Sequence, residues 1–98
     1  MSMKMKKLSL VKRLKTRTAQ GDALELRYDR IETVTEDGSG AAYGVRITAR
    51  QNGAQTCAEI CDITSREEKI RALFALLSRG TVTPETLRDV VEDWVGTV

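Results

Sequence analysis

The chain has 98 residues, the size of one small domain, which leaves room for one hydrophobic core and a shallow surface site. Charged residues make up 31% of it, and no apolar run approaches the roughly 20 residues that a membrane-spanning helix needs. The basic N-terminus lacks the uninterrupted apolar segment of a secretory signal. Histidine is absent, which excludes Ser-His-Asp and Cys-His catalysis within one chain and removes the commonest metal ligand. We therefore expect a cytoplasmic, non-membrane protein that is not an enzyme and has no cofactor or metal.

The charge is unevenly distributed along the chain. Residues 1–21 contain seven Lys or Arg and no acid, whereas the remainder contains more acidic than basic side chains. Such asymmetry is typical either of an anion-binding segment or of an ordinary solvated surface. We expect residues 1–7 to form a disordered basic lead and residues 8–98 to form a single domain.

Apolar residues alternate with polar ones in two segments of the first half, which predicts two β-strands. The first begins at Leu8 and would carry Leu8, Leu10 and Leu14 on one face. The second begins at Leu24, and its alternation changes phase near Asp29, which indicates a bulge in this strand.

Turn residues divide the rest of the predicted sheet. A turn is expected at residues 20–22 (Gln-Gly-Asp) and a loop at residues 36–40. The third strand, residues 43–50, has the clearest alternation. The Asn52-Gly53 pair that follows favours a tight hairpin turn, so the fourth strand, residues 56–63, should run antiparallel to the third.

The apolar period then changes to that of a helix. Ser65 and Glu68 have the spacing of a capping box, and Gly80 is expected to end the helix in the left-handed conformation. Thr83 and Pro84 are expected to open a second helix. The two buried stripes are predicted to be Ile70, Leu73, Phe74 and Leu77 in the first helix, and Leu87, Val90, Val91 and Trp94 in the second.

These elements predict an α+β fold: a four-stranded antiparallel sheet with a C-terminal two-helix hairpin packed on one face. The other face would meet water and would carry Arg27, Arg46 and Arg50 with Glu25. Within a strand, Cys57 and Cys61 would lie about 13 Å apart. That is too far for a disulfide, which needs Cα atoms within about 7 Å, so we expect two reduced cysteines in or beside the core.

Three segments resemble a family of small uncharacterised bacterial proteins that we associate with clostridial-type Firmicutes. They are Tyr-Gly-Val-Arg-Ile at residues 43–47, Asp-Ile-Thr-Ser at 62–65, and residues 82–94 with the pattern Val-Thr-Pro…Leu-Arg-Asp-Val-Val-Glu-Asp-Trp. The resemblance covers about residues 43–95 and implies a cytosolic stand-alone domain of unknown function. It carries over no functional residue.

The largest acidic cluster lies on the second predicted helix and comprises Glu85, Asp89, Glu92 and Asp93. At 100° per residue these acids stand opposite the apolar stripe, in water. They form either a solvated face or a docking surface for a basic partner. They also argue against reading residues 77–94 as a DNA-binding helix-turn-helix, because four acids and one base, Arg88, would be repelled by phosphates.

The candidate anion contacts are Lys12, Arg13, Lys15 and Arg17. These side chains would either bind phosphates or guard an edge strand against unwanted pairing. Nucleic-acid binding is disfavoured because the four aromatic residues all lie on predicted apolar faces and cannot stack on bases.

Two functional hypotheses follow. The leading one is a small cytosolic non-catalytic protein-interaction module, and the alternative is a weak nucleic-acid or anion binder that uses the N-terminal basic segment. The partner would be another protein or a second copy, paired through the strand near Thr56–Cys61. That segment carries one charge and no proline, so as an edge it would be open to strand pairing.

Overall fold

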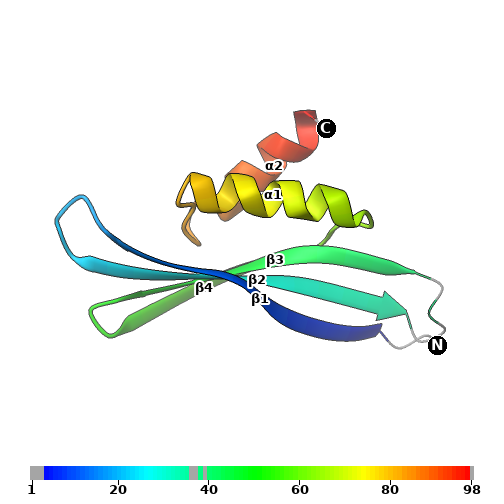
Figure 1. Ribbon diagram of the computed structural model, residues 1–98, viewed down its shortest axis with the longest axis horizontal. Coiled ribbons are helices and arrows are strands. Elements are labelled where there is room, and N and C mark those ends of the chain that lie inside the picture. Colours follow the sequence, from blue (N-terminus) through cyan, green and yellow to red (C-terminus); the bar gives the residue numbers. More distant parts are fainter. Residues whose placement is uncertain (1–3, 36–37, 39, 98) are drawn as a thin grey trace.

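The structure is a computed structural model and describes residues 4–35, 38 and 40–97. Four antiparallel strands in the order β1-β2-β3-β4 precede two helices, and both helices lie over one face of the sheet (Figure 1). This confirms the predicted α+β fold, and it places the first and fourth strands at the edges of the sheet. The elements are β1 (Lys4–Arg17), β2 (Ala23–Thr35), β3 (Ala41–Gln51), β4 (Ala54–Thr64), α1 (Glu67–Arg79) and α2 (Leu87–Thr97).

The main core lies between the sheet and the helices. All four predicted stripe residues of α1 are buried against apolar side chains of β2 and β3. On α2, Leu87 and Val91 are buried, whereas Val90 and Trp94 are half-buried at the margin of the core. Trp94 therefore packs on the core from its edge and is not the fully buried anchor that its stripe position indicates.

A bulge in β1 changes which face each half of that strand presents. The register jumps between Leu10 and Lys12, so that Val11 is an extra residue. Leu14 packs on the main core, whereas Leu8 pairs with Ile31 and lines the face away from the helices. The expectation of one apolar face for the whole strand was wrong, and the bulge predicted in the second strand lies in the first.

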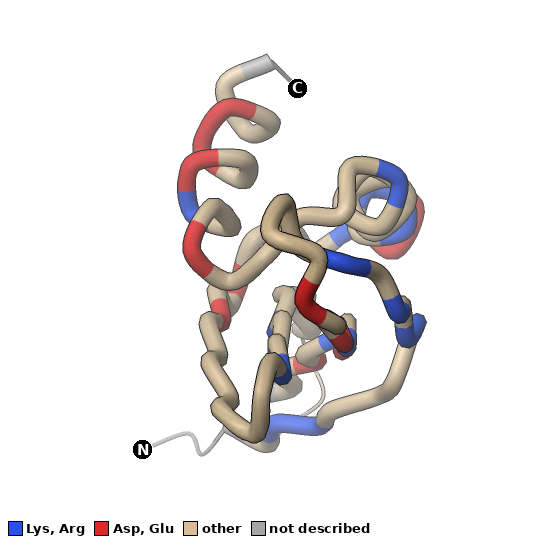
Figure 2. The backbone as a smooth tube through the Cα atoms, turned by 90° about the vertical axis from the view of Figure 1, so that its left-hand side faces the viewer, with Lys and Arg blue, Asp and Glu red and all other residues tan. Residues whose placement is uncertain are grey.

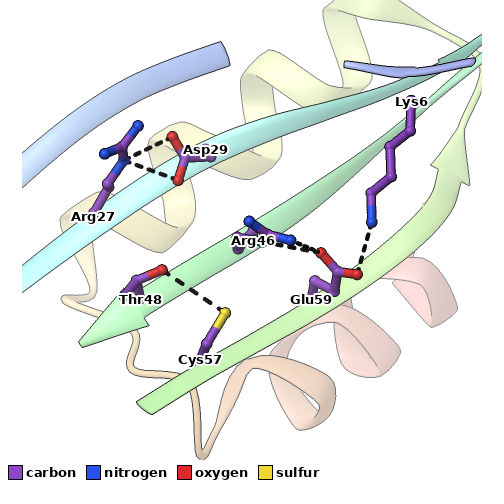
Figure 3. Close-up of polar contacts among 7 residues, drawn as sticks. All are labelled: Lys6, Arg27, Asp29, Arg46, Thr48, Cys57 and Glu59. Atoms are coloured by element: carbon purple, nitrogen blue, oxygen red, sulfur yellow. Dashed lines mark hydrogen bonds and ion pairs between the residues drawn. The ribbon is translucent and has the colours of Figure 1, made fainter. Parts of the chain in front are cut away.

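On the face away from the helices, the sheet coils strongly enough to bring its two edges together. Lys6 on β1 forms an ion pair of 2.8 Å with Glu59 on β4, although two strands separate them (Figure 3). In a flat sheet three strand spacings would hold the backbones about 14 Å apart. Gly44 permits this curvature, because a Cβ there would meet the carbonyl oxygen of Ile60 and lie 2.8 Å from the Cα of Cys61.

The start of α1 differs from the predicted capping box. Arg66, not Ser65, is the N-cap, and no side chain caps the helix. The N–H of Arg66 instead donates to Thr64 Oγ1 at 3.2 Å, which holds the chain one residue beyond the expected cap.

The end of α1 also differs. Gly80 has a right-handed φ of −84°, and the left-handed residue is Thr81 with a φ of 52°. The N–H of Val82 donates to the carbonyl of Leu77 at 3.0 Å. This hydrogen bond closes the turn at the end of the helix, and it requires the left-handed residue to be Thr81. After it, the regular part of α2 begins at Leu87, because residues 84–86 form turns.

The turns agree better with the sequence. Asn52 and Gly53 both have positive φ values, 52° and 79°, which confirms the predicted hairpin turn. Gly21 has a φ of 89° in the turn after β1. Residues 4–7 pair with the end of β2 as the beginning of β1, whereas residues 1–3 of the expected lead lie outside the described residues. The expected loop at residues 36–40 is described only at Gly38 and Gly40.

The two cysteines are free, as expected, but both are exposed. They lie on β4, whose Ala58 and Ile60 pack on the core, whereas the two cysteines do not. Cys57 is within 3.8 Å of the Thr48 hydroxyl on the face away from the helices (Figure 3). The prediction that they belong to the core was therefore wrong.

Candidate functional site

The predicted acidic cluster lies in solvent. Glu85 precedes α2, the other three acids lie on that helix, and all four are exposed. Figure 2 shows these acidic positions along α2, the helix that ends at the C-terminus. Across residues 4–35, 38 and 40–97, no three Cys, Asp or Glu side chains come close enough to hold a metal ion.

The predicted basic segment does not form one surface. Lys12 pairs with Tyr28 and lies on the helix side of the sheet, whereas Arg13 pairs with Arg27 and lines the opposite face. Arg17 donates to the carbonyl of Gly21 at 2.9 Å. The alternation of the strand places Lys12 on one face and Arg13, Lys15 and Arg17 on the other, so the four cannot surround one ligand together.

A groove of about 400 Å³ lies between the bulged part of β1 and α1. Val11 on β1 and Phe74 and Ala75 on α1 provide apolar walls. Basic side chains also line it, and none of the described acids does; they are Lys12, Arg30 and Arg71. The groove exists because α1 packs over the middle strands and leaves the helix-facing side of the β1 edge uncovered.

The floor of this groove is fixed by Tyr28. Its hydroxyl donates to the carbonyl of Val82 at 2.8 Å, and burial raises the pKa of Tyr28 to about 12. Arg30 stands over the ring of Tyr43 at 5.4 Å and pairs with Glu67 of α1 at 3.7 Å. The polar boundary of the groove is therefore held by contacts to both the helix and the sheet.

The same edge strand exposes most of the large apolar side chains that face solvent in the described part of the chain. Met5, Leu8, Leu10 and Val11 are between 45% and 60% exposed; Leu10 and Val11 line the groove beside α1, whereas Leu8 lines the opposite face. Sequence reasoning missed this surface because it placed Leu8 and Leu10 in the core with Leu14. The signal was available in Val11, which interrupts the alternation between Leu10 and Lys12.

An ion-pair cluster occupies the opposite face of the sheet. Glu59 accepts from Lys6 at 2.8 Å and from Arg46 at 3.0 Å (Figure 3). The hydrogen bond from Lys6 lowers the pKa of Glu59, and the weaker effect of Arg46 acts in the same direction. The hydrogen bond between Lys6 and Glu59 also raises the pKa of Lys6. This cluster ties the first strand to the last and stabilises the coiled sheet.

No helix among the described residues is long and apolar enough to cross a membrane. No curated protein and no solved structure gives a significant match to the chain. A family model does match, over residues 5–97, and it describes a family of unknown function, DUF6514. The match includes all four strands and both helices and extends well beyond the segments 43–95 in which the sequence resemblance was noted. The chain belongs to the DUF6514 family.

Proposed function

We propose that the protein is a non-catalytic protein-interaction module that binds an extended peptide segment along the β1 edge. The observation that carries the proposal is the groove of about 400 Å³ between β1 and α1, beside an edge strand with exposed apolar side chains. Edge strands offer unpaired N–H and C=O groups to a partner strand, and adjacent pockets select its side chains. The proposal includes a cytosolic setting in a clostridial-type bacterium, in keeping with the sequence resemblance.

The charge of the groove specifies the partner. Three basic side chains line it, Lys12, Arg30 and Arg71, and Glu67 beside it pairs with both Arg30 at 3.7 Å and Arg71 at 2.8 Å. One carboxylate against three cations leaves the groove with a net positive charge, so a segment alternating acidic and apolar residues is complementary to it. Antiparallel pairing of two β1 strands would oppose the basic side chains of residues 1–21, which lack any acid. The partner strand is therefore acidic and is not β1 of a second copy.

Fluorescence anisotropy tests this proposal with labelled eight-residue peptides that alternate Val with Glu or Val with Lys. We expect the Glu peptide to bind and the Lys peptide not to bind. Val11→Asp should weaken binding at least about ten-fold, because it removes an apolar contact and adds repulsion. Val95→Asp is the matched control, since Val95 is 52% exposed on α2 against 46% for Val11. Equal effects of the two substitutions, or no preference between the peptides, would contradict the proposal.

Self-association along β4 is a second candidate, supported by the position of β4 at the other edge of the sheet. The one charged side chain of Thr56–Cys61, Glu59, is already neutralised by Lys6 and Arg46, so it would not repel a second copy. Sedimentation velocity over a range of concentrations tests it. Ala58→Lys should abolish any dimer, and a dimer that survives this substitution would exclude β4 as the contact.

A further inference from the structure

A second groove, of about 410 Å³, lies on the face of the sheet away from the helices, and residues of all four strands line it. It is the arginine-rich face of the molecule. The charged residues of its lining are Arg13, Arg27, Arg46, Arg50, Glu25 and Asp29. Figure 3 views this face and shows Arg27 and Arg46 turned toward carboxylates on the sheet surface.

Among the described residues, two of the four arginines of this lining, Arg27 and Arg46, pair with a carboxylate. Asp29, which is 4% exposed, accepts from Arg27 Nε at 3.0 and 3.1 Å, and Glu59 beside the groove accepts from Arg46 at 3.0 Å. Arg50 contacts the side-chain oxygen of Gln55 at 3.5 Å. Considering the described residues alone, neither Arg13 nor Arg50 has a carboxylate within the 4.0 Å of an ion pair.

The strand register brings like charges together at this point. Arg13 of β1 lies directly opposite Arg27 of β2, a like-charge pairing that destabilises a sheet, and Asp29 offsets this charge only on the Arg27 side. On β3, Arg50 lies opposite Glu25 of β2. Glu25 is the residue next to Arg27 along β2 on the face away from the helices. Three guanidinium groups from three strands thus border one concavity, and Arg27 has only its Nε engaged by Asp29.

We propose that this groove binds the phosphate group of a small phosphomonoester through Arg13, Arg27 and Arg50. The planar guanidinium fork matches phosphate oxygens in a bidentate manner, and two unneutralised arginines complement a dianion. The volume is that of a small-molecule site, about 300–1,000 Å³. None of the described residues that line the groove is aromatic, so the lining offers no stacking surface for the bases of a single-stranded nucleic acid.

The test is a titration with inorganic phosphate and with glycerol phosphate, at fixed ionic strength with chloride as the reference anion. Calorimetry should give binding to the native protein and a rise of at least about ten-fold in Kd for Arg13→Gln or Arg50→Gln. Arg88→Gln, an exposed arginine on α2, is the matched control and should bind as the native protein does.

A second readout distinguishes a built site from general charge. Without phosphate, Arg13→Gln should melt at a higher temperature than the native protein, because it relieves the Arg13–Arg27 repulsion, and it should gain less from added phosphate. The proposal is overturned if phosphate stabilises Arg13→Gln and Arg88→Gln equally, or does not stabilise the native protein. A single-stranded oligonucleotide that binds more tightly than glycerol phosphate at the same salt would overturn the small-ligand assignment. Neither result bears on the proposal that the groove on the opposite face binds a peptide.

Discussion

Substitution of Gly44 by Ala should destabilise the protein more than the addition of a single methyl group would suggest. The added Cβ would meet the carbonyl oxygen of Ile60 and lie 2.8 Å from the Cα of Cys61, both of which are backbone atoms. Carbon atoms pack at about 3.5–4.0 Å, so the backbone of β4 would have to move away by close to 1 Å. Overpacking of this kind costs about 1–3 kcal/mol. In a domain of this size each kcal/mol lowers Tm by roughly 4–8 °C.

Urea denaturation and thermal melting of Gly44→Ala and Gly96→Ala measure this effect. Gly96 lies in α2 with no atom within 4 Å of an added Cβ, and Ala favours helix over Gly by up to about 1 kcal/mol. The control should therefore be neutral or stabilised. If Gly44→Ala had the same Tm as the native protein, β4 would not lie so close to β3 at this point. The role of Gly44 in the curvature of the sheet would then be refuted.

Further substitutions test other parts of the structure. Tyr28→Phe leaves the Val82 carbonyl without its 2.8 Å donor and should cost about 1–3 kcal/mol in chemical denaturation. Thr81→Gly should raise stability by about 1 kcal/mol, because a β-branched residue is strained at a φ of 52°; an unchanged Tm would contradict that strain. The pKa of Glu59 is lowered in the folded protein, so its contribution is present above the usual value of 4.5 and is lost as pH falls through the folded pKa. Melting curves should therefore show a smaller acid-induced loss for Glu59→Gln than for the native protein. Asp89→Asn and Asp93→Asn should each change stability by no more than about 0.5 kcal/mol, since both acids are exposed.

Local sequence signals were sufficient for the architecture. The alternation in residues 43–50, the Asn52-Gly53 turn and the stripe of α1 each report a property of a few neighbouring residues, and each is confirmed. With one hairpin placed and the remaining turns short, an antiparallel meander was the simplest arrangement, and the strand order agrees with it.

Features that depend on contacts between distant segments were not predictable in this way. The ion pair of Lys6 with Glu59 exists only because the sheet coils, and no local pattern encodes that curvature. Val11 interrupts the alternation locally, but pairing between β1 and β2 decides which of the two strands carries the bulge. Gly44 was the available hint, since a glycine inside a strong strand often marks close approach of another backbone.

For this reason, neither candidate groove was predicted from the sequence. Arg13 was identified as an anion contact, but its neighbours were taken from β1, whereas the groove places it with Arg27 and Arg50 of the next two strands. The acidic cluster was correctly placed in solvent, and one of its members, Glu85, also borders a groove of about 530 Å³ with Thr83 and residues of the strands. Strand register, which no single segment specifies, decided which charged residues meet.

Amide hydrogen exchange tests the central claim, that the β1 edge and its groove receive a peptide strand. The measurement compares the free protein with the protein saturated by the alternating Val-Glu peptide. Strand addition should slow exchange at the outward amides of residues 5–11, which lack a partner strand in the free sheet, and leave β4 unchanged. Binding of the peptide without slower exchange in β1, or with slower exchange confined to β4 or α2, would contradict the account.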